Sequence, residues 1–231
     1  MRVLVTRPID SANETAALLR ERGHEPVVAP LLEVRYHDGH PLHLDGVQGL
    51  LATSANGLRA FARRTSRRDF PVFAVGSQTA HAARDAGFSD VHNADGNADT
   101  LAQTVQATAK PGDGPLLHAT GAEAEGLLAA ALIAAGFTVH TEVLYDVPAA
   151  TDLPQAARDA FPTLDAVLIF SARSAQALVD CVTRAGLTPA AARIVAAAIS
   201  PAAAKPLSVL NFREVRVAAH PNQASVLDAL G

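Results

Sequence analysis

The stretch from residue 116 to residue 145, LLHATGAEAEGLLAAALIAAGFTVHTEVLY, contains the unit from which the whole chain is built. An apolar run at 116–119 is followed by leucines and alanines at helical spacing, by Gly136, and by a second run rich in β-branched residues at 138–145. Similar runs recur at 3–6, 26–34, 49–53, 72–75, 166–170, 194–199 and 215–219. Continuous apolar strands that alternate with helices are typical of an α/β fold, with a mostly parallel sheet flanked by helices.

Residues typical of helix ends lie between these runs. Asn97 is predicted to cap a helix over residues 98–108, and Ser11 with Glu14 has the spacing of a capping box. Helices are predicted to end at glycines, which tolerate a left-handed backbone: Gly23, Gly87, Gly136 and Gly186. Cys181 falls at an apolar position of a predicted helix, so we expect it in the core.

The sequence contains an internal duplication. Ser-Ala-Asn at 54–56 resembles Ser-Ala-Arg at 171–173, and residues 3–34 resemble residues 116–144. The chain therefore contains four segments in the order A (residues 3–34), B (beginning near residue 54), A′ (residues 116–144) and B′ (beginning near residue 171), which predict two similar lobes. The residues alone leave two arrangements open. In one, A and B form the first lobe and A′ and B′ the second; in the other, A and B′ form one lobe, and B and A′ form the other. Residues 34–41 and 145–154 are candidate crossing segments.

Composition argues against several classes of partner. The 231 residues are 49% hydrophobic, carry a net charge of −4 and include only 4% aromatic residues, which disfavours nucleic acid binding. No apolar run approaches the ~18 residues of a membrane helix, and no signal segment opens the sequence, so we expect no membrane partner. A single cysteine is typical of a reducing compartment, and we expect a cytoplasmic protein.

Small and hydroxyl-bearing residues follow the predicted strands at seven points, the turns that begin near Thr6, Thr53, Gly76, Thr120, Ser171, Ser200 and His220. Ligands of open α/β sheets bind outside the carboxyl ends of the strands, and each of these points is predicted to open into a helix whose first N–H groups favour anions. Helix capping alone also explains such residues. Seven such turns in two similar lobes nevertheless indicate a polyanionic ligand in a cleft between the lobes.

Familiar catalytic signatures are missing, because the sequence has no G-x-G-x-x-G, P-loop, G-x-S-x-G or H-E-x-x-H motif. His37, His40 and His43 have the spacing of metal ligands, but they lie in a Gly/Pro segment, so we expect a solvated loop and no metal site. Tyr145 ends a predicted strand beside a crossing segment. A phenol there can donate a hydrogen bond to a departing oxygen, although the residues alone favour an ordinary amphipathic tyrosine at the sheet boundary.

Taken together, these residues resemble the uroporphyrinogen-III synthase family. The resemblance covers nearly the whole chain and rests on the order and spacing of several short motifs: VLVTRP at 3–8, LATSANG at 51–57, FAVG at 73–76 with TA at 79–80, GF at 87–88, VLY at 143–145 and IFSARS at 169–174. It implies two α/β lobes joined by a two-stranded β-ladder. Lobe 1 would comprise residues 1–35 and 149–231, lobe 2 residues 41–142, and the connectors residues 36–40 and 143–148.

The same resemblance implies the substrate and the reaction. Hydroxymethylbilane, a linear tetrapyrrole with eight carboxylates, would be cyclised with inversion of its last ring to uroporphyrinogen III and water, without cofactor or metal. Tyr145 matches the family's tyrosine and would support departure of the hydroxyl. We expect a monomer that receives its substrate by transient handover from the preceding enzyme. The residues expected to bind the substrate are Arg7, Thr53, Ser54, Asn56, Gly76, Thr79, Gly121, Ser171, Arg173 and Ser200.

The sequence departs from the family pattern near one turn. Ala202 and Ala203 stand where the family often has threonines, Pro206 is expected to shorten or kink the following helix, and Asn211 replaces a glycine at its end. The two alanines favour one alternative, a catalytically silent ligand-sensing protein with the same fold. A two-lobed binding protein for another small anion is a further alternative.

Overall fold

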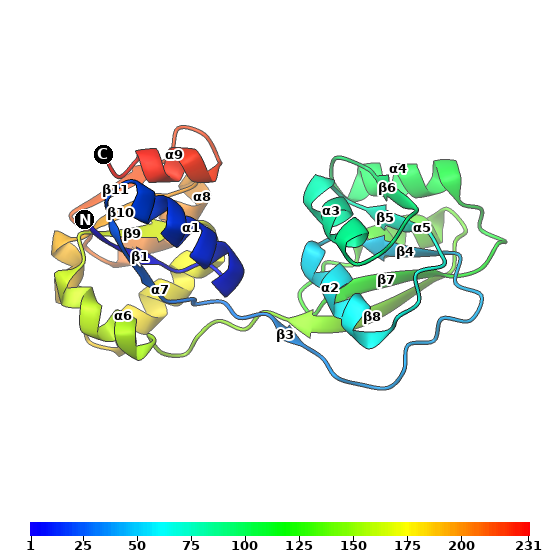
Figure 1. Ribbon diagram of the computed structural model, residues 1–231, viewed down its shortest axis with the longest axis horizontal. Coiled ribbons are helices and arrows are strands. Elements are labelled where there is room, and N and C mark those ends of the chain that lie inside the picture. The colour runs from blue at the N-terminus through cyan, green and yellow to red at the C-terminus, as the bar shows by residue number, and fades with distance from the viewer. The chain divides into compact units, whose positions relative to one another are not determined.

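The computed structural model describes the backbone of residues 1–231 and every side chain except that of Asp10. The chain divides into two compact units (Figure 1). Unit 1 comprises Met1–Glu33 and Pro148–Gly231 and so contains both termini, whereas unit 2 comprises Val34–Val147. Most residues expected to connect the lobes, 36–40 and 143–147, lie in unit 2.

Unit 1 is a parallel sheet with helices on both faces. Its strands are β1 (Arg2–Val5), β2 (Glu25–Val28), β9 (Ala166–Ile169), β10 (Val195–Ala198) and β11 (Glu214–Val217), in the spatial order β11-β10-β9-β1-β2. Its helices are α1 (Ile9–Glu21), α6 (Gln155–Ala160), α7 (Ala172–Arg184), α8 (Pro201–Ala204) and α9 (Gln223–Asp228), with the 3-10 turns η1 (Phe161–Thr163), η2 (Thr188–Arg193) and η3 (Lys205–Val209).

Alternate residues of these strands enter two separate cores. Leu4 and Val167 pack in a cluster that includes residues of α6 and α7, whereas Val3 and Leu168 pack in a second cluster with residues of α1 and α9. Burial of both faces explains why the strands are continuously apolar. Cys181 is buried in the first cluster, as expected.

Unit 2 has the same layered architecture. Its strands are β3 (Arg35–Tyr36), β4 (Gly49–Ala52), β5 (Val72–Ala74), β6 (Val91–Asn93), β7 (Leu116–Gly121) and β8 (Val139–Asp146), in the order β3-β8-β7-β4-β5-β6. All neighbours are parallel except β3 and β8. The helices α2 (Ala55–Arg64) and α3 (Ser77–Asp85) contribute to the core on one face, and α4 (Ala98–Thr108) and α5 (Leu127–Ala134) to the core on the other.

The two sheets have equivalent strand orders, which agrees with the predicted duplication. Strands β1 and β2 occupy in unit 1 the places that β7 and β8 occupy in unit 2, and β9, β10 and β11 correspond to β4, β5 and β6. Unit 1 therefore combines segments A and B′, and unit 2 combines B and A′. The α/β class with mostly parallel, helix-flanked sheets is confirmed.

Two strand segments run antiparallel where the chain passes from one unit to the other. Within unit 1, Leu32 forms a bridge with Ala149 and the Glu33 N–H donates to the Pro148 carbonyl over 3.3 Å. Within unit 2, Arg35 and Tyr36 of β3 pair with Asp146 and Tyr145 of β8. This is the pairing expected of a two-stranded ladder.

Most predicted helix ends are confirmed and two details are wrong. Asn97 forms a capping box with Thr100, and the four predicted glycines all have positive φ. Helix α1 begins at Ile9, because Pro8 fixes its entry, so Ser11 lies inside the helix and forms no capping box with Glu14. Asn211 does not have a left-handed backbone, since a 3-10 turn that contains Pro206 ends the helix beforehand.

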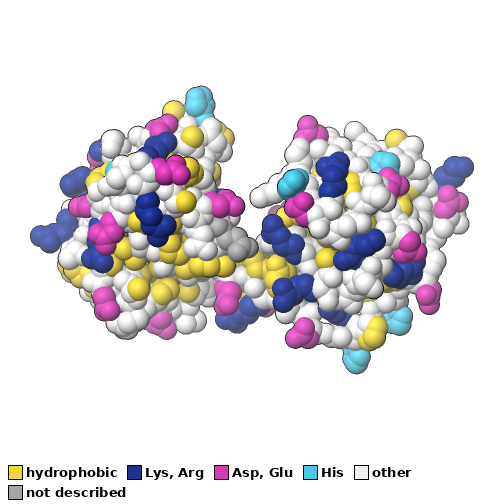
Figure 2. Space-filling model, viewed as in Figure 1, with side chains coloured by type: hydrophobic (Ala, Val, Ile, Leu, Met, Phe, Trp, Pro, Cys, Tyr) yellow, Lys and Arg dark blue, Asp and Glu magenta, His cyan; other side chains and the backbone are white. Residues whose placement is uncertain are grey.

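The surface carries charges of both signs. Figure 2 shows acidic and basic side chains interspersed over the face of each unit that is in view. None of the described helices combines the length and apolar character needed to cross a bilayer.

Candidate functional site

Each sheet has one point at which the direction of strand succession reverses. In unit 1 this switch point lies between β1 and β9, and in unit 2 between β4 and β7. Ligands of open α/β sheets bind in the crevice outside the carboxyl ends of such strands. Arg7 and Ser171 follow the two switch-point strands of unit 1. In unit 2, Ser54 follows β4 and Gly121 ends β7.

At the switch point of unit 2, Ser54 and Tyr145 are in contact. Ser54 caps α2, and its Oγ accepts a hydrogen bond from the Gly57 N–H over 3.0 Å. The same Oγ lies 2.9 Å from the Tyr145 hydroxyl, and either of these two groups can be the donor. The phenol of Tyr145 is therefore held at the N-terminus of α2, where backbone N–H groups point outward.

A β-bulge places Tyr145 in this position. Thr120 pairs with Val143, but Gly121 pairs with Tyr145, so Leu144 is an extra residue in β8. Bulges re-aim side chains beside functional sites. A Cβ on Gly121 would lie 2.7 Å from Cζ of Tyr145, which is too close for a real contact. Residue 121 is therefore a glycine because the tyrosine ring packs against its backbone.

His118 lies behind the same turn and was missed by the sequence analysis. It is 2% exposed on β7, and its Nε2 lies 3.4 Å from the Thr53 hydroxyl. Burial lowers the pKa of His118 to about 4, so the ring is neutral at physiological pH. Within the described residues its Nδ1 has no hydrogen-bond partner. A polar residue inside an apolar run, LLHAT, is the signal that would have identified it.

Arg7 occupies the switch point of unit 1. Its Cζ lies 4.3 Å from the centre of the Phe170 ring, which follows β9. Its Nη1 donates to the Thr15 hydroxyl over 3.1 Å and to the side-chain oxygen of Gln223. Partial burial lowers the pKa of Arg7, while Glu14 opposes the shift, and an arginine remains cationic at neutral pH. Arg7 therefore presents an oriented positive charge.

Ser171 is the counterpart of Ser54 in the duplicated fold. It caps α7, and its Oγ accepts from the Ser174 N–H over 3.1 Å. Arg173 is half-buried in the first turn of α7. Ser200 caps the neighbouring α8 in the same way, because its Oγ accepts a hydrogen bond from the Ala203 N–H over 3.2 Å. Helix α8 has only four residues, which agrees with the shortening expected from Pro206.

The remaining predicted residues of unit 2 differ in accessibility. Gly76 caps α3 with an extended backbone, and a Cβ there would meet nothing within 4 Å, so its amide region is open. Thr79 is only 4% exposed in α3, which leaves its hydroxyl covered. Asn56 lies in the first turn of α2, where its Oδ1 accepts from Nη1 of Arg59 over 3.2 Å.

One expectation about local structure is corrected. The turn at Gly121 does not open directly into a helix, because α5 begins only at Leu127, after Gly126 with a φ of 71°. His37, His40 and His43 form no cluster. Among the described residues, no three His, Cys, Asp or Glu side chains are grouped so that they could hold a metal ion. His37 Nδ1 instead lies 3.2 Å from the Val143 carbonyl.

Comparison with known sequences identifies one family. A family model described as uroporphyrinogen-III synthase HemD matches residues 13–228. Over 58 residues, the chain is 36% identical to a protein of Methanocaldococcus jannaschii provisionally described as a uroporphyrinogen-III synthase. This match covers 25% of the chain and 24% of the relative, so the chain aligns with only about a quarter of that protein.

Comparison with solved structures shows the same fold. The uroporphyrinogen-III synthetase of Helicobacter pylori superposes with a TM-score of 0.63 at 15% identity, over 99% of this chain and 97% of that one. A mutant uroporphyrinogen III synthase of Thermus thermophilus gives a TM-score of 0.54 at 20% identity, over 99% and 96%. Because the family model matches nearly all of the sequence, the chain belongs to the uroporphyrinogen-III synthase family.

Proposed function

We propose that this chain converts hydroxymethylbilane to uroporphyrinogen III and water, as its family implies, and that the strand-end turns of its two units bind the substrate. The observation that carries the proposal is the 2.9 Å contact between Ser54 and Tyr145 at the N-terminus of α2. It joins a helix end, which favours carboxylates, to a phenol, which donates a hydrogen bond without carrying a charge.

Each switch point is a separate cradle for carboxylates. In unit 2 the cradle consists of the first turn of α2 with Thr53 and Ser54, and in unit 1 of the first turn of α7 with Arg7. Backbone N–H groups at the start of a helix lack partners within the helix and bind anions. A substrate with eight carboxylates suits several such cradles better than one strongly cationic pocket.

In the proposed reaction, Tyr145 assists departure of the hydroxyl group. A proton taken up by the leaving oxygen, which also accepts a hydrogen bond from the Tyr145 O–H, lets it depart as water and leaves an azafulvene cation. The proton lost in the last step balances this one. The terminal ring then attacks through its substituted carbon to give a spiro intermediate. Fragmentation and reclosure at the other carbon invert this ring, and loss of a proton restores the neutral pyrrole. No oxidant, reductant or cofactor is required, because the overall change is the loss of one water molecule.

The main task of the protein in this reaction is to position the substrate. Spontaneous closure of hydroxymethylbilane gives the uninverted isomer I, so the bound geometry must favour attack through the substituted carbon. Oriented binding of this kind can supply several kcal/mol of barrier reduction without a dedicated acid–base pair. Because hydroxymethylbilane closes unaided, direct handover from the enzyme that makes it would be advantageous. We propose that the chain acts as a monomer in the cytoplasm, where its single buried cysteine stays reduced.

Product analysis tests this function. The purified protein is incubated with freshly prepared hydroxymethylbilane, the products are oxidised to porphyrins, and the isomers are separated by chromatography. We expect isomer III with the protein and isomer I in a reaction without it. If the folded protein gives only isomer I, the enzymatic proposal is wrong and the silent ligand-sensing alternative is favoured.

A further inference from the structure

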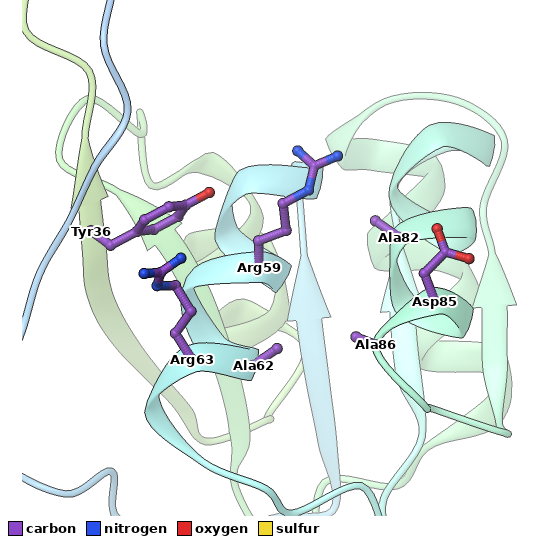
Figure 3. Close-up of a pocket in the computed structure, with 7 residues that line it drawn as sticks. All are labelled: Tyr36, Arg59, Ala62, Arg63, Ala82, Asp85 and Ala86. Atoms are coloured by element: carbon purple, nitrogen blue, oxygen red, sulfur yellow. The ribbon is translucent and has the colours of Figure 1, made fainter. Parts of the chain in front are cut away.

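A groove lies between α2 and α3 on the outside of unit 2 (Figure 3). Its volume is about 370 Å³, and Ala62 of α2, Ala82 of α3 and Ala86, which directly follows α3, contribute to its lining. Arg59 and Arg63 of α2 and Tyr36 of β3 line one side, and Asp85 of α3 lies across from them. The groove belongs to none of the strand-end turns described above.

Neither of the two arginines has an acidic partner among the described side chains. They are four residues apart on one helix, where like charges repel each other. Arg63 lies over the Tyr36 ring at 4.7 Å, and Nη1 of Arg59 donates to the neutral Asn56 side chain. Among the side chains that the structure describes, no carboxylate lies within 4.0 Å of either guanidinium. By contrast, the neighbouring Arg67 makes a 2.8 Å ion pair with Asp69.

The groove is connected to the site that contains Tyr145. Asn56, which accepts the hydrogen bond from Arg59, lies in the helical turn that Ser54 caps, and Ser54 contacts Tyr145. On the other side, Tyr36 is the direct cross-strand neighbour of Tyr145. Opposite residues of an antiparallel pair project to the same face of the sheet. Asn56 and Tyr36 therefore link the groove, which extends from Arg59 to Arg63 in the last turn of α2, to the residues around Tyr145.

We propose that this groove is a carboxylate subsite, in which Arg59 and Arg63 bind the two acidic arms of one pyrrole ring while the strand-end turns hold the rest of the tetrapyrrole. This inference rests on the proposed function. Guanidinium groups bind carboxylates through paired hydrogen bonds, and two arginines match the two arms of one ring. The carboxylate of Asp85 makes the opposite wall unsuitable for an anion, which directs the arms to α2.

Binding of two stable porphyrins tests the subsite. Uroporphyrin III carries eight carboxylates and coproporphyrin III carries four, one on each ring. We compare the wild type with the double variant Arg59→Gln/Arg63→Gln by fluorescence titration. The control is Arg20→Gln/Arg84→Gln, which removes two charges from exposed positions outside the groove. Thermal unfolding verifies that each variant is folded.

We expect the groove variant to bind uroporphyrin III about tenfold more weakly than the wild type, with a smaller loss for coproporphyrin III. The control should keep wild-type affinity for both porphyrins. In turnover assays, KM should rise while kcat stays within about twofold, because the groove does not touch the reacting carbon. Equal affinity of the wild type and the groove variant for uroporphyrin III would overturn the subsite. Failure to make isomer III would overturn the proposed function instead, and the two results are independent.

Discussion

Tyr36 and Tyr145, the two tyrosines of the chain, lie directly opposite each other in the antiparallel pair of β3 and β8. Both pack against the hydrophobic cluster that α2 shares with the sheet, but their surroundings differ. The Tyr145 hydroxyl is held by Ser54, whereas the ring of Tyr36 is covered by Arg63. One pair of neighbouring residues therefore joins the proposed hydroxyl-leaving site to the proposed carboxylate subsite.

Replacing Tyr145 with phenylalanine should slow turnover without changing the product. The variant keeps the ring and loses the hydrogen bond to the leaving oxygen, so we expect kcat to fall about 10- to 100-fold, at the low end for general acid assistance. Isomer III should remain the product, because the fold of the binding surface chooses the isomer. Steady-state kinetics with chromatographic separation of isomers measures both. A shift to isomer I, or complete loss of activity in a folded protein, contradicts this role.

Replacing Ser54 with alanine should lower activity through Tyr145. The variant removes a helix cap, which costs about 1 kcal/mol of stability, and also the partner of the phenol. Asn97→Ala is the matched control, since it removes the cap of α4, which follows the edge strand β6 of the same unit and not a switch-point strand. We expect similar losses of thermal stability but loss of kcat only for Ser54→Ala. In the Ser54→Ala/Tyr145→Phe double variant, the two effects should be less than additive. Full additivity would show that Ser54 acts independently of Tyr145.

A methyl group at Gly121 should displace the Tyr145 ring. The added Cβ of Gly121→Ala would lie 2.7 Å from Cζ of Tyr145, so the ring or the strand must shift. We expect kcat at or below that of Tyr145→Phe. Gly112→Ala serves as the control, because its Cβ meets nothing within 4 Å. Tyrosine fluorescence and turnover report the change. Wild-type kcat in Gly121→Ala would mean that the ring position does not matter for catalysis.

Burial of His118 should make stability depend on pH. Because its pKa falls from 6.5 to about 4 on folding, the unfolded chain binds more protons between these values, and the free energy of unfolding rises with pH across this window. The expected loss between pH 7 and pH 4 is about 3 kcal/mol from this group. Urea unfolding of His118→Gln should show a flatter profile than that of the wild type. Parallel profiles for the wild type and His118→Gln would contradict the burial.

Local sequence patterns predicted the fold and the strand-end turns because both depend on neighbouring residues. Apolar runs that alternate with helical spacing specify a parallel sheet covered on both faces, and Ser54 and Ser171 are recognisable as caps directly after such runs. The similarity of the two halves also predicted which strands are equivalent.

Contacts between distant residues were not predictable in the same way. Ser54 and Tyr145 are 91 residues apart, and their contact depends on the bulge in β8, which no local pattern specifies. Tyr36 and Tyr145 were both expected in the connecting ladder, but no local pattern specified that they lie directly opposite each other. Thr79 follows a strand as predicted, but packing of α3 covers its side chain. His118 is buried only because α4 and α5 cover that face of the sheet.

Amide hydrogen exchange with and without uroporphyrinogen III tests the central claim most directly, since the claim is that main-chain N–H groups at the strand ends bind the carboxylates. We predict slower exchange on binding for amides in the first turns of α2 and α7, and unchanged exchange in the Asn97 turn at the start of α4, where no site is proposed. Binding that leaves exchange at the α2 and α7 turns unchanged would contradict the account.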